Sequence, residues 1–142
     1  MVARRWLPVA LVLAASACST PQPGPPGPPQ HTVSVAVGAG SATVSTGDTL
    51  DVDFGDVNRS IGDAWFLLTP PDPAILLDQG SHFASQCDQP GCGSRLTWRF
   101  TAAKAGATTI SFRYCYRTQL ATCDPGPGRG PTTPVSLSVS VT

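Results

Sequence analysis

The sequence predicts an all-β domain, an immunoglobulin-like β-sandwich of seven to eight strands. Three observations lead to this fold class. Apolar and polar residues alternate with a period of two in many short segments, turn-forming residues separate these segments, and no window of helical periodicity reaches ten residues. Short strands at such regular spacing are typical of a sandwich of two antiparallel sheets.

The alternation is clearest at residues 135–141, where every odd position is Val or Leu and every even position is Ser. Successive side chains of a strand point to opposite faces, so this pattern indicates one buried and one solvated face. Further strands are expected at residues 32–37, 50–54, 96–100 and 110–116, and from weaker patterns at 42–44, 64–68 and 74–77. Gly, Pro and Asp residues between them supply the turns.

The same alternation assigns side chains to the two faces of each strand. Aromatic residues dominate the inward positions and should form most of the core: Phe54, Trp65, Trp98, Phe100, Phe112 and Tyr114. Polar residues occupy the outward positions, which should be solvated: Asp51, Asp53, Thr97, Arg99, Ser111 and Arg113.

Residues 1–17 form a predicted export signal. Arg4 and Arg5 precede an apolar run over residues 6–17, which is too short for a membrane-spanning helix of about 20 residues. Residues 15–18 read Ala-Ser-Ala-Cys and resemble the lipobox of bacterial lipoproteins, although a Leu is more usual than Ala15. This resemblance implies that Cys18 carries a lipid anchor in the cell envelope. The alternative is an ordinary signal peptide cut near Ala17.

The rest of the chain divides into a stalk and one domain. Residues 18–30 follow the signal and contain six prolines and no core-forming side chain, so they predict a flexible stalk. Residues 31–142 are long enough for one domain with one core. Without Arg4 and Arg5, seven basic residues face nine aspartates, a net charge of about −2 that argues against nucleic-acid binding. We expect a monomer.

Four cysteines lie in the domain: Cys87, Cys92, Cys115 and Cys123. An even number in an exported domain indicates two disulfides, and three pairings are formally open. We favour the local pairs Cys87–Cys92 and Cys115–Cys123, each of which would close a loop at the end of a strand. The outward position of Cys115 on its strand also favours a partner in a loop.

Catalytic chemistry is not indicated by the sequence. The chain has no Glu, no Gly-x-Ser-x-Gly motif and no phosphate-binding glycine loop. His82 with Cys87 or Cys92 could in principle form a nucleophilic pair or a metal site, but the spacing fits no common zinc module and disulfides explain the cysteines better. Asp51, Asp53 and Asp56 could bind calcium, but the first two follow from strand alternation. We therefore expect neither an enzyme nor a metal or other cofactor.

The segment around Asn58 carries a family resemblance. Asn58, Gly62 and Trp65 have the spacing of the Asn-Pro-Thr-Thr-Gly-Tyr-x-Trp segment in chagasin-type cysteine peptidase inhibitors, which the chain resembles here. The departures are Arg59, Ile61 and Asp63, which replace the Pro, the second Thr and the aromatic residue.

Two later segments are also similar to that family. Gly91 and Gly93 match its Gly-x-Gly-Gly loop, with Ser94 in place of the last Gly, and an aromatic strand follows at residues 98–100. Tyr116 and Arg117 fall where the family has its Tyr-Arg-Pro-Trp loop, but among the loop residues that follow Tyr116 only Arg117 is retained, because Thr118 and Gln119 stand where Pro-Trp is expected. The similarity extends over about residues 33–141.

The resemblance implies an inhibitor of papain-like cysteine peptidases, in which three loops at one end of the domain block the active-site cleft. The middle loop, residues 91–94, would lie over the catalytic thiolate, where small residues permit close approach. Disulfides would lower the entropy cost of ordering the loops on binding. The implied peptidase contacts are Asn58, Ser60, Ile61, Gly62, Gly91, Cys92, Gly93, Ser94, Arg117, Thr118 and Gln119.

A second hypothesis uses the same fold without inhibition. The glycines of these segments could be turn residues that need positive φ, and Trp65 could be a core residue. The domain would then be an immunoglobulin-like interaction or stability module of the cell envelope, because one fold hosts many functions.

The lipid anchor yields the first testable prediction. Cys18→Ser should release the protein from membranes into the soluble fraction, because the stalk and domain offer no other apolar segment of bilayer length. Membrane fractionation followed by immunodetection measures this release. A Cys18→Ser protein that stays entirely with the membranes would contradict the prediction.

Overall fold

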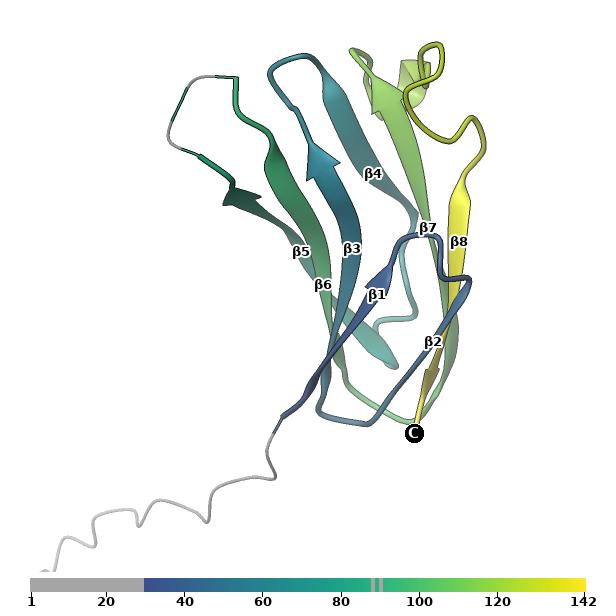
Figure 1. Cartoon of the computed structure of the whole chain (residues 1–142). Helices are drawn as coiled ribbons and strands as arrows, with labels where there is room; N and C mark the ends of the chain where they lie inside the picture. Colours follow the sequence, from purple (N-terminus) through teal and green to yellow (C-terminus); the bar gives the residue numbers. More distant parts are fainter. Residues whose placement is uncertain (1–29, 88, 90) are drawn as a thin grey trace, which may run out of the picture.

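The computed structural model describes residues 30–87, 89 and 91–142. The predicted signal peptide, Cys18 and the stalk up to residue 29 lie outside this range. The described residues form eight strands in two four-stranded sheets that pack face to face (Figure 1). The predicted all-β sandwich is confirmed. In the part of the chain that is described, no helix is long and apolar enough to cross a membrane.

The two sheets draw their strands from all parts of the domain. The first sheet has the order β1 (Thr32–Ala36), β3 (Thr49–Val57), β6 (Ser94–Ala102) and β5 (Leu76–Ser85). The second has the order β2 (Ser41–Val44), β8 (Val135–Val141), β7 (Gly106–Tyr116) and β4 (Asp63–Thr69). The pairs β1–β3 and β2–β8 are parallel, and all other neighbours are antiparallel.

Strand β5 is the one that differs most from its predicted bounds, although β3, β6 and β7 are also longer than predicted. A strand was expected at residues 74–77, but β5 spans Leu76–Ser85. It lies at the edge of the first sheet, and nearly all its residues after Leu76 are exposed, including Leu77 and Phe83. Since neither face of this strand is buried along its length, its sequence shows no alternation of apolar and polar residues.

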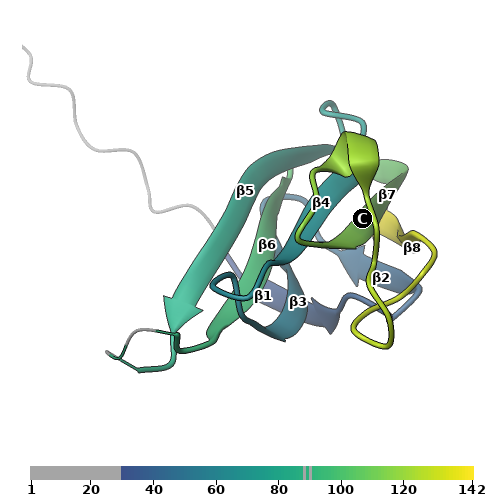
Figure 2. The same cartoon turned by 90° about the horizontal axis from the view of Figure 1, so that it is seen from above.

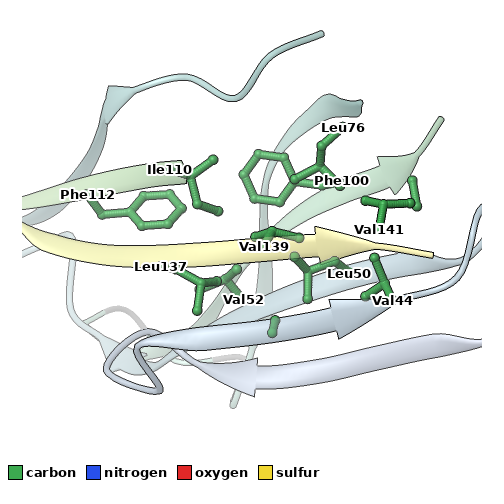
Figure 3. Close-up of a cluster of buried hydrophobic side chains, with 12 residues drawn as sticks. Val44, Leu50, Val52, Leu76, Phe100, Ile110, Phe112, Leu137, Val139 and Val141 are labelled. Atoms are coloured by element: carbon green, nitrogen blue, oxygen red, sulfur yellow. The ribbon is translucent and has the colours of Figure 1, made fainter. Parts of the chain in front are cut away.

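The core lies between the two sheets, and Phe112 is one of its buried side chains (Figure 3). The rings of Phe54, Trp98 and Phe100 lie 4.9, 5.6 and 6.4 Å from the Phe112 ring, centroid to centroid. Of the six aromatic residues predicted to point inward, Phe100, Phe112 and Tyr114 are buried, and the other three pack partly buried against the core. All six are therefore buried or packed against the core, as predicted, but aliphatic side chains and not aromatic ones make up most of the buried cluster.

On the outer face of the first sheet, acidic side chains of β3 pair with arginines of β6. Arg99 donates two hydrogen bonds of 2.8 Å to the carboxylate of Asp51, and Arg95 forms an ion pair with Asp53. The hydrogen bond from Arg99 lowers the pKa of Asp51. These two carboxylates therefore bind arginines across the sheet, as outward positions should.

Two outward positions of β7 are buried, contrary to the prediction of a solvated face. Ser111 is 7% exposed, and its hydroxyl donates to Thr69 Oγ1 at 2.7 Å on the neighbouring strand. Cys115 is fully buried and bonded to Cys123. Position parity predicts the face of a sheet on which a side chain lies, but not whether another segment then covers that face.

Three connections gather at one end of the sandwich, at the top of Figure 1. We call them the first loop (58–62, between β3 and β4), the middle loop (86–93, between β5 and β6) and the third loop (117–134, between β7 and β8), and together the loop end. Thr32, at the start of β1, pairs with Thr49 at the start of β3, whereas β3 runs on to Val57 beside the first loop. The domain therefore begins at the opposite end from the three loops.

The packing of Phe112 gives the second prediction. Phe112→Ala should lower the free energy of unfolding by about 3–5 kcal/mol, because it removes the ring that the other aromatic residues contact. The matched control is Leu77→Ala, at an exposed position of β5, which should stay within about 0.5 kcal/mol of wild type. Urea denaturation followed by tryptophan fluorescence measures both. Equal losses in the two variants would be inconsistent with a core that contains Phe112.

Candidate functional site

The first loop is a tight turn that is closed by its own hydrogen bonds. The carbonyl of Asn58 accepts from the backbone N–H groups of Ile61 and Asp63, at 3.3 and 3.2 Å. The Asn58 side-chain oxygen accepts from Ser60 N–H at 3.1 Å. Asn side chains commonly bind backbone groups two residues on in this way, so the loop has a defined shape.

Asp63 ties the base of the first loop to the neighbouring strand β7. One of its oxygens accepts from Asn58 N–H at 3.0 Å, and the other accepts from the Tyr114 hydroxyl at 2.6 Å. Burial, together with the hydrogen bond to Asp63, raises the pKa of Tyr114 to about 12. The tyrosine therefore remains a neutral donor at physiological pH. Asp63 stands where the family pattern has an aromatic residue, and in this structure its carboxylate holds the base of the first loop.

Arg117 connects the first loop to the third. Its backbone N–H donates to Gly62 O, and its Nε donates to Ile61 O, both at 2.8 Å. Arg117 has φ of 54°, a left-handed conformation that is uncommon for a residue with a side chain. Gly62, with φ of 105°, faces it so closely that an added Cβ would lie 2.4 Å from Arg117 Cγ. Only glycine fits at position 62.

The middle loop is held by a disulfide and by a bond to the first loop. Cys87 and Cys92 are bonded to each other, as predicted. Asn58 Nδ2 donates to Gly91 O at 3.1 Å, across the gap between the two loops. Within the loop, Gln86 N–H donates to Gly93 O at 3.3 Å. The first loop is therefore hydrogen-bonded to both of its neighbours, and Figure 2 shows its backbone between theirs.

The third loop folds back over β7 through several local contacts. Tyr116 N–H donates to Asp124 O at 2.7 Å, and Asp124 N–H donates to Thr118 Oγ1 at 3.0 Å. A short 3-10 turn, Leu120–Thr122, leads to the disulfide between Cys115 and Cys123, which is the second predicted pair. The guanidinium groups of Arg117 and Arg129 lie 5.0 and 4.2 Å from the centre of the Tyr116 ring.

Apolar side chains project from the loop end. Ile61 of the first loop and Leu120 of the third are each 36% exposed. Nearby on β5, the exposed ring of Phe83 lies under the guanidinium of Arg59, at 4.7 Å. Apolar groups with a polar and charged rim are a common composition of protein-binding surfaces.

The eleven predicted contact residues all lie on the loop end or where it meets a strand, but they do different things there. Asn58, Gly62 and Arg117 link the loops, and Thr118 accepts a hydrogen bond within the third loop. Ser94 is the first residue of β6 and pairs with Val57. The sequence did not indicate the hydrogen bond between Asp63 and Tyr114, since it joins residues 51 positions apart on two different strands.

The alternatives that involved His82 find no support in this arrangement. His82 lies on β5 opposite Thr97, and both cysteines that could have joined it are in a disulfide with each other. Across residues 30–87, 89 and 91–142, no group of three or more His, Cys, Asp or Glu side chains could hold a metal ion.

Loops held on a rigid scaffold, like those at this end of the sandwich, are a common place for binding residues. Residues 43–125 match the family described as Chagasin family peptidase inhibitor I42, and this match covers more than half of the 142-residue chain. The chain therefore belongs to the chagasin family of peptidase inhibitors, as its motifs led us to expect. No curated protein matches the sequence.

Two solved structures share the fold at low sequence identity, and a third is similar with a lower TM-score. The cysteine protease inhibitor EhICP2 from Entamoeba histolytica is 16% identical with a TM-score of 0.57, covering 82% of this chain and all of that one. Amebosin is 15% identical with a TM-score of 0.54, covering 81% of this chain and all of its own. PbICP-C, solved in complex with falcipain-2, is 17% identical with a TM-score of 0.41, covering 80% of this chain and 92% of its own.

The contact between Gly62 and Arg117 gives the third prediction. Gly62→Ala should lower the free energy of unfolding by about 2–3 kcal/mol, because it adds both backbone strain and a clash with Arg117. The matched control is Gly91→Ala, which also has positive φ (84°) but nothing within 4 Å, and should cost about 1 kcal/mol. Chemical denaturation compares the two variants. If Gly91→Ala proved the more damaging, the close packing of the first and third loops would be wrong.

Proposed function

We propose that this protein inhibits papain-like cysteine peptidases by inserting the loop end into their active-site cleft. Membership of a family of peptidase inhibitors supports this function. A solved structure of the same fold, EhICP2, is itself described as a cysteine protease inhibitor. The observation that carries the proposal is that the first loop is hydrogen-bonded to both other loops.

These bonds matter because they set the entropy cost of binding. Separate flexible loops would each lose conformational freedom when a peptidase binds, whereas loops that are already linked lose little. Both disulfides also lower this entropy cost, since one closes the middle loop and the other holds the third loop to β7. A preformed wedge of this kind suits the rigid cleft of an enzyme.

Each loop would have its own part in the complex. The middle loop would lie over the catalytic thiolate, where Gly91 and Gly93 leave its backbone free of side chains. The first loop would present Ile61, an exposed apolar group whose carbonyl accepts from Arg117. Leu120 of the third loop is also exposed, but it lies beside Leu68 and Arg113 of the second sheet.

We further propose that the inhibitor is displayed on the cell envelope by a lipid on Cys18. The domain begins at the end opposite the loops, so a chain anchored through its N-terminal stalk would direct the loop end away from the membrane. The stalk would provide the reach that a peptidase needs in order to bind.

The fourth prediction tests inhibition at the middle loop. The chain without its predicted signal peptide, residues 18–142 with Cys18→Ser, should slow cleavage of a fluorogenic peptide by papain at pH near 6. Adding Gly93→Trp to this chain should abolish the inhibition. An added Cβ at Gly93 has only ordinary contacts, to Val57 O at 3.6 Å and Gln86 Oε1 at 3.7 Å, so the fold should tolerate the change. A tryptophan would nevertheless keep the loop backbone away from the thiolate.

Two controls accompany the Gly93 variant. Leu77→Trp introduces the same bulk at an exposed site on the far end of β5 and should leave inhibition unchanged. Gln119→Ala should be nearly silent, because Gln119 stands where the family's contact residue is lost. Thermal denaturation shows whether each variant is folded. If micromolar wild-type protein inhibits neither papain nor a cathepsin-like enzyme, the proposed function is wrong and a non-inhibitory envelope module is favoured.

A further inference from the structure

The two disulfides of this domain differ in their accessibility. Cys115 is fully buried beneath the third loop, and its bond to Cys123 closes a segment along β7. Cys87 is exposed and Cys92 half-buried, at the tip of the molecule in the middle loop. Buried structural disulfides resist attack by thiols, whereas exposed ones exchange readily.

The chain around Cys92 leaves its sulfur open to approach. Its two neighbours are Gly91 and Gly93, so neither carries a side chain beside the bond. A Cβ added at Gly91 would have no atom within 4 Å, which places that side of the loop in open space. Thiol–disulfide exchange requires in-line access to a sulfur atom, and these residues permit it.

Opening this disulfide would not release the middle loop. Gly93 O still accepts from Gln86 N–H at 3.3 Å, and Gly91 O from Asn58 Nδ2 at 3.1 Å. Ser85 and Ser94 pair as the last rung between β5 and β6. A bond between cysteines only five positions apart also restricts the unfolded chain less than a long-range one does. The disulfide is therefore not needed to hold the backbone in place.

We propose that the Cys87–Cys92 disulfide is a reactive site, and that the thiolate of a bound cysteine peptidase opens it to form a reversible covalent complex. This inference rests on the proposed function, which brings the middle loop to that thiolate. The peptidase sulfur attacks Cys92 Sγ and forms a new S–S bond. The bond between Cys92 and Cys87 breaks, and Cys87 leaves as a thiolate that takes a proton from water. No external oxidant or reductant is consumed.

Thiol–disulfide exchange at this site favours cysteine peptidases over ordinary thiols. A catalytic thiolate paired with an imidazolium has a pKa of about 3–4, so it is ionised at pH 6, whereas an ordinary thiol with a pKa of about 8.5 is almost wholly protonated there. Only the thiolate attacks a disulfide. The reaction also reverses, because Cys87 remains beside Cys92 and can attack the mixed disulfide and release the enzyme unchanged.

Intact-mass measurement under non-reducing conditions tests the proposal. Papain is activated, freed of reducing agent, and mixed at pH 6 with the exported chain carrying Cys18→Ser, which removes the odd thiol. The expected result is a species with the summed mass of both proteins. Dithiothreitol should separate it into the two proteins, and peptide mapping should locate the linkage at Cys92. Papain with an alkylated catalytic thiol should give no such species, and glutathione at pH 6 should leave the disulfide closed.

The single variant Cys87→Ser, which keeps the predicted contact residue Cys92, separates this proposal from the proposed function. It should still inhibit papain, more weakly because the middle loop is no longer cross-linked, but it should form no covalent species, because Cys92 is then a thiol and not part of a disulfide. Enzyme activity should also return faster on dilution than with the intact disulfide. Wild-type inhibition without a covalent species would overturn the reactive disulfide and leave the inhibitor intact. A link through Cys115 or Cys123 would also overturn it. The absence of both inhibition and a covalent species would overturn both proposals.

Discussion

The arrangement of the loop end depends on hydrogen bonds that the first loop exchanges with both of its neighbours. Asn58 donates to Gly91 O in the middle loop, and Arg117 of the third loop donates to Gly62 O and Ile61 O. Loops of this kind bury few apolar groups, so packing alone would leave them poorly ordered. Backbone carbonyls are the acceptors in each of these bonds, and two of the donors are the side chains of Asn58 and Arg117, so the shape of the loops depends on these two residues.

The first loop can act as this centre because the sandwich core fixes its base. Asp63, at the start of β4, accepts from Asn58 N–H and from the hydroxyl of Tyr114, whose ring is buried with its strand β7. A carboxylate taken partly out of water is costly unless its oxygens are hydrogen-bonded, and here each oxygen has a donor. The packing of the two sheets thus determines where the loop lies, and the loop in turn positions the other two.

Much of the fold followed from alternation, and its failures have physical causes. Strands with one buried face, such as β8, carry the pattern in full, whereas β5 is exposed on both faces and carries none. The buried state of Cys115 could not be read from its parity, because a loop formed later in the chain covers it. The three loops were predicted as segments. The bond between Asn58 and Gly91 was not, since it joins residues 33 positions apart that only the assembled sandwich brings together.

The residues shared with the family motif divide by what they do in the structure. Asn58, Gly62 and Arg117 are retained, and all three take part in the links between loops. At a replaced position in the third loop, other interactions hold the turn. Thr118 stands in place of a proline, but its hydroxyl accepts from Asp124 N–H and the Cys115–Cys123 bond closes the same turn. What this chain has kept of the motif is therefore the set of residues that links the loops, and its departures from the motif fall mainly at side chains outside those links.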